Sequence, residues 1–383
     1  MENKRQKLEL SDILSKHADV FLKEKKMVPV QYKAFRDIAS CRTESMGGHA
    51  KSCDHCGYKQ FSYNSCRNRH CPKCQYLKQV QWVEKLKSNL FDCPYYHIVF
   101  TLPKNLHKAI YINQFSAYAL MFKAASQALK QCIGNPNFIG AQYGAVGILH
   151  TWGQNLSYHP HIHMMVPAGG LSTDEMEWVS AGKSFFVPVN VLTKLYRAIF
   201  CRLFFKEVGN KSIVLPKEEL SATDLKQKLF SQRWHVYIQK PFNTAKHVVD
   251  YLGKYTHRVA ISNQRLIADQ DGKIIFKYKD YRDGGIQKVI KLEVREFLNR
   301  FSRHILPSGF YKIRYFGILS LSNSTTKRAL CYEFLGKICY FPALEGLPYW
   351  DILNLITKAD PFCCPICKTG RMLLSGPSPI SSG

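Results

Sequence analysis

The chain has 383 residues, 46% of them hydrophobic, which is enough for a buried core and for two or three domains. Its 54 lysine and arginine residues exceed its 28 aspartate and glutamate residues, and the net charge of +26 points to a polyanionic partner, nucleic acid before an anionic membrane. No stretch approaches 18 uninterrupted apolar residues and the N-terminus lacks the apolar core of a signal peptide, so the sequence argues against a membrane span and predicts a cytoplasmic protein.

The N-terminal part alternates between helical and cysteine-rich sequence. Residues 8–26 place apolar side chains at helical spacing, and residues 76–90 do so again. Between them, residues 41–74 are rich in Cys, His, Asn and Gly and are expected to form loops. Fourteen cysteines in a chain that is not secreted indicate metal ligands more than disulfides.

Two Cys-x-x-Cys pairs lie in this stretch. The first pair is Cys53 and Cys56, and the second is Cys71 and Cys74. Each pair can place two thiolates on one ion, and two pairs complete a tetrahedral site. We therefore expect these four cysteines to hold one structural zinc ion, with no coordination position left for a substrate.

A second, interleaved zinc site is expected nearby. Its candidate ligands are Cys41, His49, Cys66 and His70. Surface or DNA-facing positions are the alternative for the two histidines. Basic residues stand among the ligands and are candidate DNA contacts: Arg67, Arg69 and Lys73.

The middle of the chain is predicted to contain buried strands at residues 95–103, 145–152 and 161–167, with a long helix at 106–132. In the third strand His161 and His163 are two residues apart, so they share one face of the sheet while Ile162 faces the core. Two histidines at this spacing indicate a divalent metal more than a structural role.

A third metal ligand is needed, and Gln154 is preferred because a hairpin would bring it alongside the histidine strand. The rival residues are His97, His150, His159 and His257. Two neutral imidazoles and an amide oxygen suit an open Mg²⁺ or Mn²⁺ site with positions for phosphate oxygens, although such a set could also hold zinc.

Further along, a helix at 191–208 and a strand at 234–238 precede a helix at 244–256 that carries Tyr251 and Tyr255. Residues four apart share one helix face. Lys254 and Arg258 place cations beside the pair. Most of the 21 tyrosines must be packing residues, but together with the histidine strand this pair predicts two nucleophiles.

The expected chemistry is attack of a tyrosine oxygen on a metal-bound phosphate. A phenol with a pKa of about 10 is a weak nucleophile, so the metal must draw charge from the phosphate and orient it. The tyrosine displaces a 3′ hydroxyl and keeps a 5′-phosphotyrosine bond. Two tyrosines allow two successive strand transfers.

The C-terminal part is predicted to contain a hairpin at 274–292, a helix at 293–305 and a disordered tail. Arg314 is a further candidate DNA contact. The Cys-Cys-Pro-Ile-Cys stretch at 363–367 is either a zinc knuckle, partnered by Cys331 or Cys339, or inert.

Strands interspersed with helices predict an α+β fold with a mainly antiparallel sheet. We expect a zinc-binding, DNA-contacting domain at 1–90, a catalytic domain at 91–305 and a C-terminal region at 306–383.

Several stretches, in this order, also carry a likeness to a known family: residues 53–75, 97–103, 149–154, 159–163, 251–262, 279–282 and 309–317. On these motifs the chain resembles the transposases of the insertion-sequence-91 family, a two-tyrosine branch of the His-hydrophobic-His endonucleases. The likeness implies rolling-circle-like transposition through single-stranded DNA in a bacterial cytoplasm, at the nucleoid, with nicking at transposon ends and at a short target. It implies His161 and His163 as metal ligands and Tyr251 and Tyr255 as nucleophiles.

The same likeness leaves strand separation to host replication or a host helicase. A plasmid relaxase or rolling-circle replication initiator would share the chemistry and differ in its DNA context. A zinc-dependent DNA-binding regulator without catalysis would use the charge and the cysteines but leave the histidines and tyrosines without a role. A metal-dependent hydrolase acting through water would not need the tyrosines.

Overall fold

The computed structural model describes residues 7–182, 186–217, 221–242, 259–336 and 344–377. The chain divides into two compact units, each assembled from separate stretches of sequence. The first unit comprises Met1–Lys85, His257–Ile305 and Pro342–Gly383, and the second comprises Leu86–Thr256 and Leu306–Phe341. The structure thus divides the chain differently from the three consecutive segments expected from the sequence.

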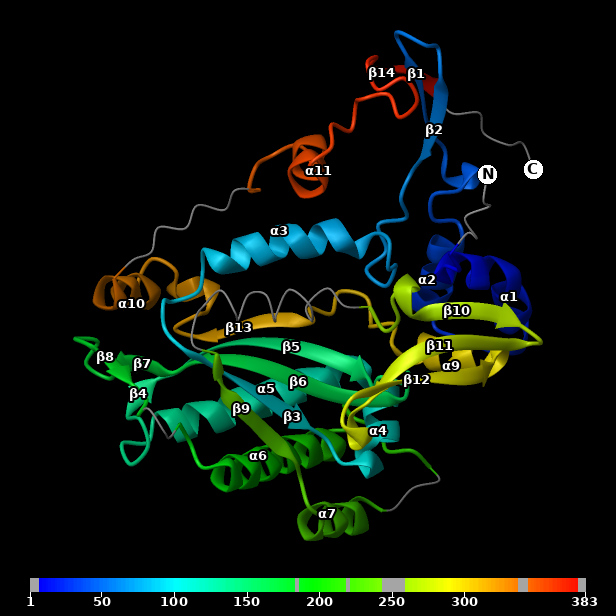
Figure 1. Cartoon of the computed structure of the whole chain (residues 1–383). Helices are drawn as coiled ribbons and strands as arrows, with labels where there is room; N and C mark the ends of the chain where they lie inside the picture. The colour runs from blue at the N-terminus through cyan, green and yellow to red at the C-terminus, as the bar shows by residue number, and fades with distance from the viewer. Residues whose placement is uncertain (1–6, 183–185, 218–220, 243–258, 337–343, 378–383) are drawn as a thin grey trace. The chain divides into compact units, whose positions relative to one another are not determined.

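The second unit is built on a five-stranded antiparallel sheet with the strand order β13-β5-β6-β3-β9. Its strands are β3 (Tyr95–Thr101), β5 (Gly144–Trp152), β6 (Tyr158–Pro167), β9 (Val236–Phe242) and β13 (Ile313–Gly317). Helices α5 (Gln114–Ile133) and α6 (Val189–Gly209) cover one face of this sheet (Figure 1). Mixed helix and antiparallel sheet confirm the α+β class.

Strand alternation divides the sheet's side chains between two faces. Ile98, Ile162 and Met164 point to the helices and belong to the main hydrophobic core, where each is 0% exposed. The positions between them point to the opposite face, which is where the histidines lie. The core therefore fixes the orientation of every strand and, with it, the orientation of the polar residues.

The long helix expected at 106–132 is two helices, α4 (His107–Ile112) and α5, interrupted at Asn113. The side chain of Asn113 donates from Nδ2 to the carbonyl oxygens of Ala109 and Val214, both at 2.8 Å. An amide side chain that bonds its own backbone competes with the helix, and this explains the break. The remaining elements of this unit are η2 (Lys104–Leu106), β4 (Ala141–Gln142), β7 (Gly169–Ser172), β8 (Trp178–Ser180), α7 (Ala222–Ser231), η5 (Leu321–Asn323) and α10 (Lys327–Leu335).

The first unit packs N-terminal helices against a later helix and sheet. Phe35 stacks between Phe21 and Phe301, at ring-centroid distances of 5.8 and 5.7 Å. These contacts explain why residues 257–305 join the N-terminal helices. The elements are α1 (Leu10–Glu24), α2 (Pro29–Ala39), η1 (Glu44–Met46), α3 (Gln75–Lys87), η3 (Asn263–Arg265), β10 (Leu266–Gln270), β11 (Lys273–Asp280), η4 (Tyr281–Asp283), β12 (Ile286–Glu293), α9 (Val294–Arg303) and α11 (Tyr349–Thr357).

A small three-stranded sheet, ordered β14-β1-β2, completes the first unit. Its strands are β1 (Gly48–Cys53), β2 (Lys59–Tyr63) and β14 (Met372–Pro377). The stretch 41–74, expected to be loops, therefore contains a hairpin, and its partner strand comes from the opposite end of the chain. Within the described ranges, no helix is both long and apolar enough to cross a membrane.

Candidate active site and metal centres

Three histidines meet on the sheet face that is turned away from α5 and α6. His161 and His163 alternate with the core residue Ile162 on β6, as the sequence predicted. His150 of β5 is paired directly with His161 in the sheet register. The ligand nitrogens of His150, His161 and His163 all lie within 4.8 Å of one another, so the three rings could share one metal ion.

His161 has a hydrogen bond that fixes which of its nitrogens would bind a metal. Its Nδ1 lies 2.6 Å from the carbonyl oxygen of His159, and because a carbonyl can only accept, Nδ1 carries the proton. A metal would then be bound through Nε2. In metal-binding histidines, a hydrogen-bond acceptor on the other ring nitrogen sets the tautomer and the direction of the ring.

His163 is oriented by a chain of two side chains on neighbouring strands. Its Nδ1 lies 2.8 Å from Nε2 of His97, and Nδ1 of His97 lies 3.0 Å from Oε1 of Gln239. Since the amide oxygen accepts from His97 Nδ1, His97 Nε2 accepts in turn from His163 Nδ1. A metal would again be bound through Nε2. In the sequence, His97 is only a rival ligand and Gln239 is not singled out, because the role of Gln239 depends on strand register.

Burial disfavours the charged form of His161 and of two histidines near it. It lowers the pKa of His161 to about 3, with the neighbouring His159 lowering it further. Burial also lowers the pKa of His97 and of His159. Neutral imidazoles are the form that binds a metal, so the site is chemically suited to a cation at neutral pH.

Gln154, the preferred third ligand, lies two residues beyond the end of β5, in the loop that joins it to β6. His150, one of its rivals, is inside the strand and directly beside the histidine pair. Its ring stacks on Trp152 at a centroid distance of 4.9 Å. The structure thus provides a third imidazole where the sequence favoured an amide.

The paired nucleophile candidates and their neighbouring cations, Tyr251, Tyr255, Lys254 and Arg258, lie outside the described residues. The preceding strand β9 is described and ends at Phe242. It belongs to the same sheet as the histidines and is separated from β6 by β3 alone.

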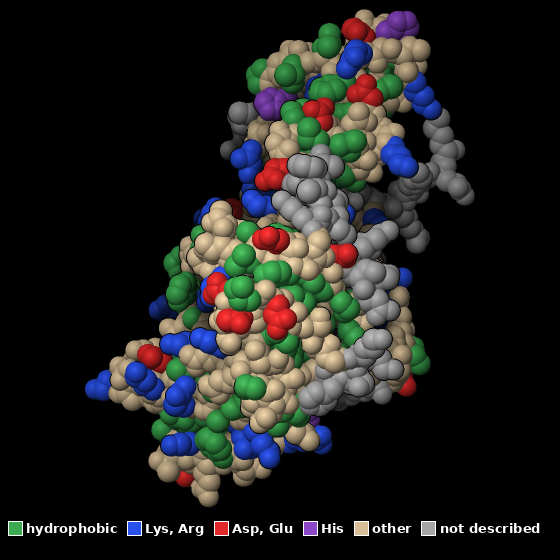
Figure 2. All heavy atoms as spheres, turned by 90° about the vertical axis from the view of Figure 1, so that its left-hand side faces the viewer, with side chains coloured by type: hydrophobic (Ala, Val, Ile, Leu, Met, Phe, Trp, Pro, Cys, Tyr) green, Lys and Arg blue, Asp and Glu red, His purple; other side chains and the backbone are tan. Residues whose placement is uncertain are grey.

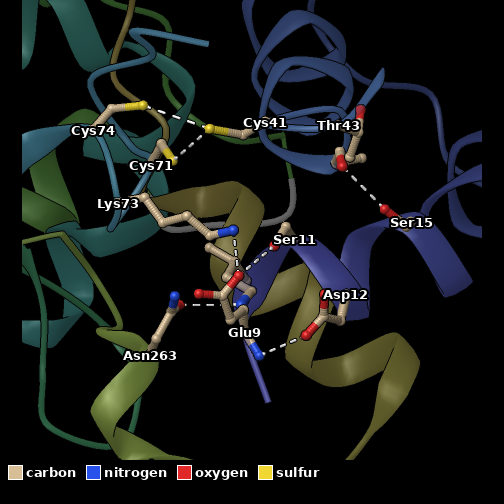
Figure 3. Close-up of polar contacts among 12 residues, drawn as sticks. Glu9, Ser11, Asp12, Ser15, Cys41, Thr43, Cys71, Lys73, Cys74 and Asn263 are labelled. Carbon is tan, nitrogen blue, oxygen red and sulfur yellow. Dashed lines mark hydrogen bonds and ion pairs between the residues drawn. The ribbon is translucent and has the colours of Figure 1, made fainter. Parts of the chain in front are cut away.

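One thiol cluster, in the first unit, combines Cys41, Cys66, Cys71 and Cys74. Figure 3 shows three of these residues, Cys41, Cys71 and Cys74. Sulfur–sulfur distances are 3.6 Å from Cys74 to Cys41 and to Cys66, and 3.7 Å from Cys71 to Cys41. Hydrogen bonds with Cys66 and Cys71 lower the pKa of the Cys41 thiol to about 6. Four converging thiols form a closed tetrahedral set of the kind that holds structural zinc.

A separate cluster combines Cys53 and Cys56 with Cys364 and Cys367. This corrects the expected grouping of the first two Cys-x-x-Cys pairs on one ion. Cys53 ends β1, at the tip of the β1–β2 hairpin, whereas Cys41 and Cys66 flank its base. A six-residue strand spans roughly 20 Å at about 3.3 Å per residue, too far for the two pairs to share an ion.

Neither histidine of the expected second zinc site joins a thiol cluster. His49 is exposed on β1, and the backbone nitrogen of His70 donates to Asn68 Oδ1 at 2.9 Å. Both sets of four thiols are complete without them. The sequence singled out six of the eight clustered thiols but not which of them lie together.

The cations predicted to contact DNA have different environments. Arg67 is exposed, while burial lowers the pKa of Arg69. Lys73 forms an ion pair with Glu9 at the N-terminus of α1 (Figure 3). Arg67 is therefore the most accessible of the three, and the charge of Lys73 is partly neutralised.

Arg314 lies on the helix-facing side of the sheet. It is paired with Gly147, and its guanidinium carbon is 4.8 Å from the ring centroid of Phe122 and 5.0 Å from that of Phe310. Strand alternation therefore turns it away from the histidine face. A DNA contact by Arg314 stays a prediction, and any such contact lies on the opposite face of the sheet from the histidines.

Comparison with known proteins now adds to this geometry. A family model described as a putative transposase matches residues 144–327, and one described as a transposase zinc-binding domain matches residues 13–102. A putative transposase, y4qJ, of Sinorhizobium fredii is 37% identical over 374 residues, covering 95% of this chain and 94% of its own. The chain belongs to the insertion-sequence-91 family of transposases.

A further relative of this transposase is the transposase for insertion sequence element IS801 of Pseudomonas savastanoi pv. phaseolicola. It is 26% identical over 362 residues, covering 90% of this chain and 84% of its own. No solved structure matches. The protein is thus a DNA transposase with structural zinc in its N-terminal part.

The two family models match different sites of the transposase. The zinc-binding model includes all four cysteines of the first cluster but ends long before Cys364 and Cys367. The transposase model includes the three clustered histidines. On the face shown in Figure 2, Lys and Arg side chains are spread over the surface with acidic side chains among them.

Proposed function

We propose that this transposase nicks and rejoins single-stranded DNA at transposon ends and at the target through a tyrosine nucleophile and a divalent metal. The observation that carries the proposal is the convergence of His150, His161 and His163 within 4.8 Å on one sheet face. A histidine pair on a central antiparallel strand is what a His-hydrophobic-His endonuclease requires. Membership of the transposase family supports transposon ends as the DNA on which this chemistry acts.

The proposed metal ligands are Nε2 of His161, Nε2 of His163 and a ring nitrogen of His150. Their donor set fits a cation because burial lowers the pKa of His161, and because His161 and His163 have fixed Nδ1 partners. Three imidazoles are softer than the set with an amide oxygen expected from the sequence, so we expect Mn²⁺ to bind more tightly than Mg²⁺. The bound ion would polarise the scissile phosphate and stabilise its developing charge.

In the proposed reaction the oxygen of Tyr251 or Tyr255 bonds to phosphorus as the bond to the 3′ oxygen breaks. The phenol loses its proton and the departing 3′ oxygen gains one, so that a 5′-phosphotyrosine and a free 3′ hydroxyl result. The reverse attack by another 3′ hydroxyl rejoins DNA without an external energy source. Tyr251 follows the last residue of β9 by nine residues, and such a length can span up to ~30 Å, so chain length does not prevent it from reaching the histidines.

The test uses the full chain with labelled single-stranded DNA from a transposon end and Mn²⁺ or Mg²⁺, followed by denaturation. We expect a covalent protein–DNA band that is lost when both Tyr251 and Tyr255 are replaced by Phe, while DNA binding is retained. Tyr237→Phe, at an exposed position on β9, is the matched control and should leave the band unchanged.

The outcomes separate the competing functions. Cleavage that persists without a covalent band in the double variant would indicate a hydrolase that acts through water. DNA binding with no cleavage by the wild-type chain in any metal would indicate a zinc-dependent DNA-binding regulator. A covalent band formed equally on plasmid origin DNA and on transposon ends would favour a replication initiator or relaxase.

A further inference from the structure

We propose that Cys53, Cys56, Cys364 and Cys367 hold a second structural zinc ion, which joins the two ends of the transposase chain into one zinc-binding module. Cys53 Sγ lies 3.6 Å from Cys367 Sγ, and Cys56 Sγ lies 3.7 Å from Cys364 Sγ. Sulfurs at about 2.3 Å from one tetrahedral zinc are about 3.8 Å apart, whereas a disulfide requires about 2.05 Å. The distances fit four ligands around one ion.

The two Cys-x-x-Cys knuckles have the same backbone construction although 308 residues separate Cys56 from Cys364. After the second cysteine each has a residue with left-handed φ, Gly57 at 67° and Lys368 at 59°. The nitrogen of Gly57 donates to Cys53 O at 3.2 Å, and that of Lys368 donates to Cys364 O at 3.1 Å. Each knuckle thus turns its own two thiols to one side.

Backbone amides in both knuckles donate to sulfur. Cys56 N lies 3.4 Å from Cys53 Sγ, and Gly370 N lies 3.3 Å from Cys367 Sγ. Amide donors favour the thiolate form, which is the form that binds zinc.

Direct contacts hold the two knuckles together. Arg371 N donates to Asp54 Oδ1 at 2.7 Å, and Asp54 N donates to Arg371 O at 3.1 Å. A Cβ at Gly370 would lie 2.4 Å from Cys53 Sγ, so only glycine permits this approach. β14, which follows, pairs with β1 and extends the contact as a sheet.

The apolar core at this place is too small to hold these strands by itself. Its buried members are Cys53, Cys364 and Met372, with Cys367 packed against them. Three of the four are proposed metal ligands. Small modules with so little apolar burial depend on a metal or a disulfide for their fold.

This arrangement replaces the partners that the sequence suggested for the C-terminal knuckle. Cys331 is buried in α10, which belongs to the other unit, and Cys339 lies outside the described residues. The zinc-binding family model covers residues 13–102 and thus half of the proposed ligands. The module is complete only when the last part of the chain has been made, so a chain that ends before Cys364 lacks this zinc.

The experiment is the zinc content of the purified full chain, measured by elemental mass spectrometry against protein concentration. It is done in the His161→Ala/His163→Ala background, so that zinc in the histidine cluster does not contribute. We expect two zinc ions per chain, and one when Cys364 and Cys367 are both replaced by Ser. Cys363→Ser is the matched control, because Cys363 is outside the cluster, and it should keep two.

One zinc ion per chain before any cysteine is replaced would overturn the proposal, and this result does not depend on the folding of a cysteine variant. Two zinc ions retained after loss of Cys364 and Cys367 would overturn it as well. Cys367→His, which keeps a fourth ligand, should retain the second ion that Cys367→Ala loses. DNA cleavage is not measured, so failure here leaves the proposed function untouched.

Discussion

Nε2 of His97 lies 2.8 Å from Nδ1 of His163, and the two rings are parallel to within 3°. His97 stands on β3 and His163 on β6, so the contact crosses between neighbouring strands. Gln239 of β9 accepts a hydrogen bond from the other ring nitrogen of His97, Nδ1. Three strands thus cooperate to orient one proposed metal ligand, and His97 is a positioning residue.

His97→Ala should weaken Mn²⁺ binding about 10- to 100-fold, which is the usual effect of losing such a second partner. His97→Gln should restore part of this affinity, since its amide oxygen can accept from His163 Nδ1. His235→Ala is the control, because that exposed side chain comes directly before the edge strand β9. Calorimetric titration with Mn²⁺ measures the affinity, and equal affinities for His97→Ala and wild type would refute the positioning role.

The third metal ligand can be decided by two single variants. His150→Ala should abolish metal-dependent nicking, because one of the three proposed metal ligands is lost. It should also lower Mn²⁺ affinity by about 100-fold or more, which is at least the largest loss usual for a hydrogen-bond partner of a metal ligand. Gln154→Ala should retain both within a few-fold. The opposite pattern, with Gln154 essential and His150 dispensable, would return the site to the ligand set favoured by the sequence.

The basic residues of the first thiol cluster should contribute unequally to DNA binding. Arg67→Gly removes an exposed charge at a position whose φ of 53° suits glycine. It should lower affinity and reduce the slope of log K against log salt by about one, as the loss of one phosphate contact does. Lys73→Gln should change the slope less, because Lys73 is paired with Glu9. Titrations at several salt concentrations measure both, and a larger effect of Lys73 would contradict this ranking.

The junction of β13 and β5 should be intolerant of a side chain at Gly317. A Cβ there would lie 1.8 Å from the carbonyl oxygen of Tyr143, and the φ of Gly317 is 57°. Gly317→Ala should destabilise the protein by about 3 kcal/mol, a fall in Tm of roughly 5–10 °C. Gly209→Ala at the end of α6, where a Cβ meets nothing within 4 Å, should leave Tm unchanged or raise it slightly. Thermal unfolding followed by circular dichroism compares them, and equal melting of the two variants would contradict the expected clash.

Local pattern predicted much of the fold. The apolar runs of β3, β5 and β6 and the helical spacing of α1 and α6 were read correctly because each depends on burial of one face by residues close in sequence. The break at Asn113 was missed because its partner, the carbonyl of Val214, is about a hundred residues away. The hairpin of β1 and β2 was missed because polar residues dominate it.

The sequence by itself determined which local groups of histidines and cysteines could bind a metal. Alternation on a strand put His161 and His163 on one face, and the two-residue gap in each Cys-x-x-Cys pair made each pair a knuckle, since both depend only on backbone geometry over a few residues. Only the tertiary structure decided which groups share an ion. His150 rather than a loop amide meets the histidine pair because strand register sets it opposite His161. Cys53 and Cys56 meet Cys364 and Cys367 because β14 pairs with β1, and no local pattern specifies a pairing between the two ends of a chain.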